Sequence, residues 1–270
     1  MQRISDNNMK IVVMLTCHNR RAKTINCING LSCSTADVHF IVVDDGSTDG
    51  TIEALEDRAD VTLIKENGNM FYSGGMRRAM EYALVNTDAD YYVLVNDDVV
   101  FYEGILDKLK LLKDDTVYVG AMKDSHDNCS YGGVRYYKGI HYNKVTPESV
   151  DRRCDTFNAN YVVIPRGIFK TVPIMDAHYI HSLGDFDYGL SIRNAGYPIE
   201  VLDYYAGVCD NNTVTGTWND RSLSRRERLR LKESVKGAPF KPWFYFLKKN
   251  FGLLYAVVYS ITPYIRIIIG

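Results

Sequence analysis

The stretch HFIVVDDGSTD, residues 39–49, joins a short apolar, β-branched run directly to two carboxylates and a glycine turn. Such a run, bounded by turn residues, is typical of a strand buried in a parallel sheet. A second run of this kind, KIVVMLT, occupies residues 10–16, and residues 20–31 between the two have a helix-like composition. After the second run, a Thr-Asp pair can cap a helix over residues 51–58. The chain therefore begins in the order strand, helix, strand, helix.

The same alternation continues further along the chain. We expect strands at residues 61–64, 91–95 and 117–122, and helices at residues 74–85 and 104–113. Alternation of this type predicts a parallel sheet with helices on both faces. Residues 130–147 are rich in Tyr, Gly and polar residues, which indicates a hairpin or an irregular excursion. The expected fold class is α/β, with a Rossmann-like, mostly parallel sheet.

Composition and charge exclude several classes of protein. A chain of 270 residues can bury a large core without disulfides, and its formal net charge of -1 gives no reason to expect a nucleic-acid partner. The six cysteines form no C-x-x-C pair, which argues against a zinc ribbon or a thioredoxin-like site. Residues 1–9 are polar and lack the apolar segment of a secretory signal, so we expect a cytoplasmic protein.

Polar motifs follow three of the predicted strands. They are TCHNR at residues 16–20, DDGS at residues 44–47 and NDD at residues 96–98. Ligands of open α/β sheets bind beyond the carboxyl ends of the strands. Adjacent carboxylates there repel one another unless a cation is bound, and hard oxygen ligands favour Mg²⁺ or Mn²⁺. Alternatively, one aspartate of NDD caps the next helix and the other is solvated.

A fourth motif, GDFDYGLSIRNAGY, occupies residues 184–197. The four motifs, in this order, resemble those of glycosyltransferase family 2, and the resemblance extends over residues 10–210. It implies the GT-A fold and an inverting, metal-dependent transfer of a sugar from a nucleotide-sugar donor to an acceptor hydroxyl. The resemblance further implies a role in the synthesis of surface polysaccharide or glycolipid.

The resemblance also implies which residues bind the nucleotide sugar. The first nucleotide-contacting loop corresponds to Thr16, His18, Asn19 and Arg20. The carboxylates that recognise the base and the ribose correspond to Asp44 and Asp45. The element that approaches the donor diphosphate corresponds to Gly74, Gly75, Arg77 and Arg78. Glycines allow a close backbone approach, and a helix N-terminus favours anions.

The metal and the reacting centre correspond to the later motifs. Asp98 matches the family's metal-binding aspartate, with Asn96 and Asp97 beside it, and Asp185 matches the catalytic base. Further substrate contacts are expected from residues near Asp185 or before the apolar run 161–165, namely Asn160, His181 and Asp187. Asn160 also suits a polar turn, and His181 suits a structural histidine. A zinc site of His178 and His181 with nearby aspartates is a weaker alternative.

Three departures from the family pattern keep other functions open. Gly184 stands where the family often has Glu, Asn96 begins the D-x-D-like motif, and Asp210 lies in a region where many members have a metal-binding histidine. The alternatives are a sugar nucleotidylyltransferase and a non-catalytic module that binds nucleotide sugars or glycans. A nucleotidylyltransferase usually has a glycine-rich loop after the first strand, and residues 16–20 contain no glycine.

The C-terminal tail differs from the rest of the chain. Bases cluster between residues 221 and 249, and an apolar, aromatic stretch follows at 251–269, interrupted by Pro263 and Arg266. The stretch is marginal for spanning a bilayer but suits the membrane interface; the alternative is a helix packed on the core. We expect a catalytic domain at residues 1–220, with a nucleotide part (10–122) and an acceptor part (123–220). The tail, residues 221–270, would attach it to the inner face of the cell membrane, near a glycan or lipid-linked acceptor.

Overall fold

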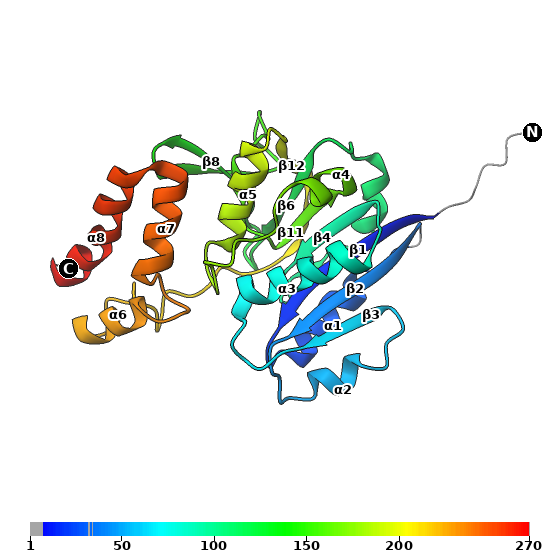
Figure 1. Ribbon diagram of the computed structural model, residues 1–270, viewed down its shortest axis with the longest axis horizontal. Coiled ribbons are helices and arrows are strands. Elements are labelled where there is room, and N and C mark those ends of the chain that lie inside the picture. The colour runs from blue at the N-terminus through cyan, green and yellow to red at the C-terminus, as the bar shows by residue number, and fades with distance from the viewer. Residues whose placement is uncertain (1–7, 32, 34, 270) are drawn as a thin grey trace, which may run out of the picture.

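A computed structural model of the protein describes residues 8–31, 33 and 35–269 (Figure 1). In this part of the chain nine strands form one main sheet, in the order β3-β2-β1-β4-β11-β6-β12-β5, with β7 paired to β6. The α/β fold class predicted from the alternation of elements is confirmed.

The first half of the sheet is parallel. It consists of β1 (Met9–Cys17), β2 (Ala36–Asp44), β3 (Val61–Lys65) and β4 (Tyr91–Val95). In the β1–β2 register Cys17 lies opposite Asp44, so the first loop and the DDGS motif leave the sheet side by side. The carboxyl ends of the parallel strands therefore bring the first three polar motifs to one edge.

The second half of the sheet is mixed. Its strands are β5 (Val100–Phe101), β6 (Val117–Lys123), β7 (Cys129–Tyr131), β11 (Tyr161–Pro165) and β12 (Ile199–Val208). Strand β11 lies antiparallel between β4 and β6, while β12 is parallel to β6. The strand β11 returns from a small antiparallel sheet of β8 (Gly133–Lys138), β9 (His141–Val145) and β10 (Thr156–Phe157), which confirms the excursion expected at residues 130–147.

Helices cover both faces of the sheet, as Figure 1 shows. They are α1 (Arg21–Gly30), α2 (Thr51–Leu55), α3 (Phe71–Asn86), α4 (Arg166–Thr171) and α5 (Gly184–Asn194). The prediction of an α-helix at residues 104–113 is wrong, because the segment forms a short 3-10 helix, η1 (Leu106–Leu111). Leu106 and Leu109 are its buried residues, and their i, i+3 spacing aligns side chains on a three-residue turn.

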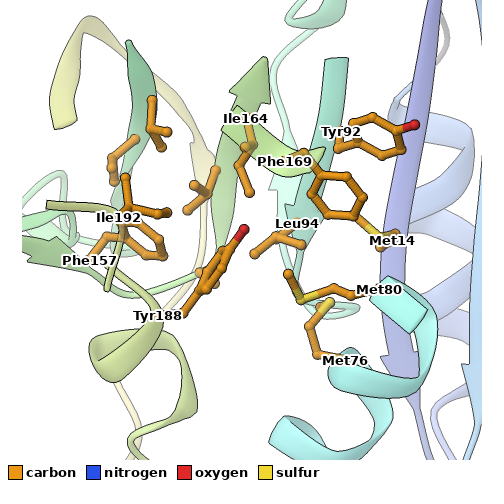
Figure 2. Packing of buried hydrophobic residues seen from close by; sticks show 14 of the residues in the cluster. Met14, Met76, Met80, Tyr92, Leu94, Phe157, Ile164, Phe169, Tyr188 and Ile192 are labelled. Carbon is orange, nitrogen blue, oxygen red and sulfur yellow. The ribbon is translucent and has the colours of Figure 1, made fainter. Parts of the chain in front are cut away.

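Two apolar clusters fill the two faces of the sheet. Figure 2 shows part of the first, in which methionines of α3 face strand residues Met14 and Leu94. Tyr92 stacks on Phe169 of α4 with ring centroids 3.9 Å apart. Helix α3 packs closely on β1, because a Cβ atom at Gly75 would collide with the Thr16 hydroxyl.

The tail forms three helices, α6 (Arg225–Lys232), α7 (Phe240–Phe251) and α8 (Leu253–Ile269). Helix α7 packs against α5 through a third apolar cluster that includes Tyr179, Leu190, Phe246 and Leu247. Helix α8 forms a hairpin with α7 and continues through Pro263. Among the described residues, no helix is both long and apolar enough to cross a membrane.

Candidate active site

The first loop and the DDGS loop are joined by hydrogen bonds. The Nδ1 atom of His18 lies 2.6 Å from the carbonyl oxygen of Asp45. Asn19, in a left-handed conformation with φ of 51°, accepts a bond from the Thr48 amide at 2.7 Å and donates its own amide to the Ser47 hydroxyl at 2.8 Å. These bonds fix the loop that carries three of the four expected nucleotide contacts; the fourth, Thr16, packs on Gly75 at the end of β1.

The two aspartates of the DDGS motif are buried. Asp44 accepts the amide of Ser47 at 2.8 Å. The carboxylate of Asp45 accepts three backbone amides, from Gly68 at 2.9 Å, Met70 at 3.0 Å and Phe71 at 2.7 Å. Asp45 therefore anchors the start of α3, a role that the sequence interpretation missed. Its proposed contact with the nucleoside stays a prediction.

The geometry of α3 differs from the expectation for residues 74–78. The helix begins at Phe71, three residues before the predicted start. At that end, the carboxylate of Asp45 already accepts the hydrogen bond of the Phe71 amide. Gly74 and Gly75 consequently lie inside the helix, where their lack of a side chain allows close packing rather than an open turn. The predicted helix start at residue 74 is therefore wrong, whereas the approach of residues 74–78 to the donor diphosphate stays a prediction.

The two arginines of this segment have different surroundings. Arg78 pairs with Glu66 at 3.2 Å and also approaches Glu81 at 3.8 Å. Arg77 approaches Glu81 at 3.7 Å, and its Nη1 atom is buried with no hydrogen-bond partner among the described residues. Because an orphaned guanidinium nitrogen is costly to bury, Arg77 is the better placed of the two to bind an anion.

Arg20 holds the two adjacent carboxylates at the end of β4. Its Nη1 atom lies 2.9 Å from Asp97 Oδ1 and 3.0 Å from Asp98 Oδ2. Asp97 is buried and also accepts a bond from the Thr24 hydroxyl at 3.4 Å. Burial raises the pKa of Asp97 to about 6, and the negative charge of Asp98 adds to the shift while Arg20 opposes it. The cluster carries an excess of negative charge at the sheet edge.

This arrangement fits a divalent cation that shares its ligands with a substrate. The described residues contain no cluster of three or more His, Cys, Asp or Glu side chains that could cage a metal. Mg²⁺ in particular is often held by one or two carboxylates together with substrate phosphates. Asp98 is the more exposed carboxylate of the pair. A cation bound to Asp98 would take over the charge compensation that Arg20 provides.

Asn96 forms a hydrogen bond with Asn160. Its Nδ2 atom donates to Oδ1 of Asn160, which precedes β11. The remaining polar atoms of this pair, Asn96 Oδ1 and Asn160 Nδ2, are buried without a partner in the described part of the chain. Asp210 accepts the Ser125 amide at 2.7 Å, so the structure shows it as a loop anchor.

Asp185 lies in the first turn of α5. Its carboxylate accepts the amides of Phe186 at 2.9 Å and Ala159 at 3.3 Å, and burial raises its pKa to about 6. The departure at Gly184 has a packing cause, because a Cβ atom there would lie 2.5 Å from the Ser73 hydroxyl. A glutamate does not fit at this position while α3 and α5 keep their contact.

His181 and Asp187 contact different elements of the structure. His181 lies by α3, where its carbonyl accepts the Ser73 hydroxyl at 2.7 Å and its ring centroid is 6.0 Å from that of Phe71. Burial lowers its pKa, as do the nearby bases Lys236 and Arg20. His178 pairs with Asp176. The described residues contain no group of three or more His, Cys, Asp or Glu side chains that could hold zinc.

Asp187 faces the C-terminal helices. It is fully buried and contacts Lys249 Nζ at 2.6 Å, Asn250 Nδ2 at 2.9 Å and the Tyr179 hydroxyl at 3.1 Å. No local sequence pattern indicates this pairing, because Lys249 is 62 positions away in the tail. Its contacts with substrate stay a prediction.

Comparison with known proteins places the chain in a family. The sequence profile of glycosyl transferase family 2 matches residues 12–170, which is more than half of the chain. The protein belongs to glycosyl transferase family 2. It is a glycosyltransferase of the GT-A type. No curated protein sequence matches the chain.

Two solved glycosyltransferase structures resemble the whole chain. One is TarS residues 1–349 from S. aureus, with a TM-score of 0.55 and 13% identity over 97% of this chain and 81% of that one. The other is the mannosyltransferase PcManGT from Pyrobaculum calidifontis in complex with GDP-Man and Mn²⁺, with a TM-score of 0.54 and 16% identity over 95% of this chain and 73% of that one. At these identities the likeness shows the fold.

Proposed function

We propose that the protein is an inverting, metal-dependent glycosyltransferase that moves a sugar from a nucleotide-sugar donor to an acceptor hydroxyl. One observation carries the proposal: hydrogen bonds connect the segment that carries Asp97 and Asp98, at the end of β4, to Asp185. Asn96 precedes the two carboxylates and bonds to Asn160, and the amide of the preceding Ala159 bonds to Asp185. A donor bound at the carboxylates would thus present its sugar near a base with a raised pKa.

The proposed reaction is a single displacement. The carboxylate of Asp185 takes the proton of the acceptor hydroxyl as that oxygen forms a bond to the anomeric carbon. The bond from the anomeric carbon to the diphosphate breaks, and its electron pair leaves with the nucleoside diphosphate. One in-line attack inverts the anomeric configuration. When bound at Asp98, Mg²⁺ or Mn²⁺ supplies neutralisation of charge on the diphosphate, and Arg77 offers a further cationic contact.

The chemistry of the products tests this function against its alternatives. Donor nucleotides are screened first by thermal shift with Mn²⁺, since a ligand at 100 times its dissociation constant adds roughly 2.7 kcal/mol of stability. The GDP-mannose bound by PcManGT gives one starting point for the screen. A transferase releases free nucleoside diphosphate when acceptor is added. Release of pyrophosphate indicates a nucleotidylyltransferase instead, and binding without either product indicates a non-catalytic module.

We further propose that the tail, residues 221–270, attaches the catalytic domain at residues 1–220 to the inner face of the cell membrane. Helix α8 has an exposed apolar stripe with helical spacing, made of Leu254, Val257, Val258, Ile261, Ile265 and Ile268. Bases flank the stripe at Lys248 and Arg266. An amphipathic helix of this kind suits the boundary between headgroups and acyl chains, and favours a lipid-linked acceptor in surface polysaccharide or glycolipid synthesis.

A further inference from the structure

A cavity of about 530 Å³ lies between the start of α3 and the segment around α6. Phe71 forms one wall, and Trp218, Leu231, Val235 and Lys236 form much of the other. The cavity is of the size that small ligands occupy, with mostly apolar walls and few polar groups. Two aromatic rings in one small cavity suit the apolar face of a sugar ring.

The cavity lies next to the segment that leads to Asp185, through Phe71, and its lining contains no motif of the donor edge. None of the residues in the first loop, the DDGS motif or the NDD motif lines it. Phe71 forms the boundary: its amide bonds to Asp45, and its ring faces His181, in the loop that leads to Asp185. Phe71 has a φ of 52°, and such strain in a residue other than glycine persists where the surroundings enforce it, often at ligand sites.

The wall opposite Phe71 is held in place by the tail. The Trp218 carbonyl accepts the Nε atom of Arg228 at 3.0 Å, which ties the loop before α6 to that helix. At the end of α6, the Nζ atom of Lys232 bonds to the Ala238 carbonyl at 2.9 Å and closes the turn that carries Lys236. Apart from Phe71, the lining lies beyond residue 170, outside the family match.

One base, Lys236, lines the cavity. The neighbouring helix α6 carries further exposed bases at Arg225, Arg226 and Arg230, and none of them forms an ion pair with the described residues. The acids of this segment already have partners: Glu233 binds Lys232 at 2.7 Å, and Glu227 caps α6 through Ser224. The unpaired charge favours an anionic ligand.

We propose that this cavity is the acceptor subsite and that the acceptor is a sugar with an attached anionic group, phosphate or carboxylate, which Lys236 recognises. The inference rests on the proposed function, because the cavity is assigned to an acceptor only if the edge beside it binds a donor. The sugar ring stacks between Phe71 and Trp218, with its hydroxyl directed toward Asp185. The anionic group points to Lys236.

Trp218 provides a direct readout of binding. The chain has two tryptophans, so Trp243→Phe leaves Trp218 as the single tryptophan, which is excited selectively over tyrosine at long wavelength. Its fluorescence is titrated with the 1-phosphates of glucose, N-acetylglucosamine and mannose, with glucuronate, and with the neutral sugars. We expect a saturable change with at least one anionic sugar and at least tenfold weaker binding of its neutral counterpart. Equal binding of the neutral sugar, or no saturable change with any anionic sugar, overturns the proposal.

Matched variants test the assignment of Lys236. In the same background, Lys236→Gln should weaken the anionic sugar at least tenfold, whereas Lys110→Gln, at an exposed lysine of η1, should leave its affinity within twofold. Equal effects of the two variants overturn the assignment. An octyl ester of the same sugar phosphate distinguishes the source of the anion, because tighter binding of the ester indicates a lipid-linked acceptor. Failure of donor binding in the thermal-shift screen counts against the proposed function, independently of this titration.

Discussion

The ammonium group of Lys249 lies 2.6 Å from the carboxylate of Asp187, and so connects α7 to the helix that carries Asp185. The same ammonium group lies 3.0 Å from Asp176, whose carboxylate also accepts the Tyr245 hydroxyl at 2.8 Å. Asp187 is only two residues from Asp185 in the first turn of α5. The tail therefore helps to set the position of the proposed base.

Lys249→Met should destabilise the protein, because it leaves the buried carboxylate of Asp187 without its cation. Breaking a buried pair from one side costs roughly 3–5 kcal/mol, and we expect the lower end because Lys249 is partly exposed. Urea denaturation measures the change. The control is Lys248→Met, at an exposed neighbour, which should alter stability little. Equal stability of the two variants would show that the pair contributes nothing.

Asp185→Asn should reduce turnover roughly 10²- to 10⁴-fold, because the amide keeps the shape of the side chain but cannot accept the acceptor proton. Donor affinity should be almost unchanged. Release of nucleoside diphosphate measures turnover, and thermal shift measures donor binding. Asp203→Asn, at an exposed residue paired with Arg152, is the control. Turnover within a few-fold of the wild type would place the base elsewhere.

The raised pKa of Asp185 predicts two pH effects. Activity should fall below about pH 6, since protonation removes the base. Burial favours the protonated form, so the stability contribution of Asp185 is complete below its unfolded pKa near 3.8 and is lost as pH rises through about 6. Asp185→Asn should therefore unfold at a higher temperature than the wild type at pH 7.5. This advantage should shrink toward pH 4. Calorimetry at several pH values measures the two unfolding temperatures, and equal temperatures at pH 7.5 would contradict the prediction.

The sequence predicted the positions of polar residues best where a polar motif directly follows a buried strand. The positions of Asp44, Asp97 and Asp98 follow from buried strands and a shared parallel edge, and the structure confirms that edge. The antiparallel insertion of β11 was not predictable from alternation, because its pairing depends on the long return through residues 123–160.

Long-range partners account for the rest of the differences. The three amides that bind Asp45 lie 23 to 26 positions along the chain, and no local pattern identifies them. Gly184 has the same explanation, since the hydroxyl of Ser73 excludes a side chain there. Sequence patterns identify which residues reach the edge, whereas tertiary contacts decide which of them remain free to bind.

Asp98→Ala should abolish the dependence of donor binding on Mn²⁺. Asp98 is the more exposed carboxylate of the pair that Arg20 holds, so it is the one open to a cation. Thermal shift with the donor nucleotide, with and without Mn²⁺, measures the effect. Asp88→Ala removes an exposed carboxylate paired with Arg166 and is the control. A retained Mn²⁺ response in Asp98→Ala would contradict the metal assignment.

The exposed stripe of α8 predicts how the protein attaches to membranes. We expect co-sedimentation with anionic vesicles that weakens at high salt, because each base near an anionic surface contributes about 1 kcal/mol and salt screens it. Val258→Glu puts a charge in the stripe and should weaken binding about tenfold, equivalent to ~1.4 kcal/mol. Val85→Glu changes a more exposed valine on α3, away from the stripe, and should have little effect. Binding that persists on neutral lipid at high salt would instead indicate deep insertion of the helix, and no binding to either lipid would leave α8 as a packing element of the fold.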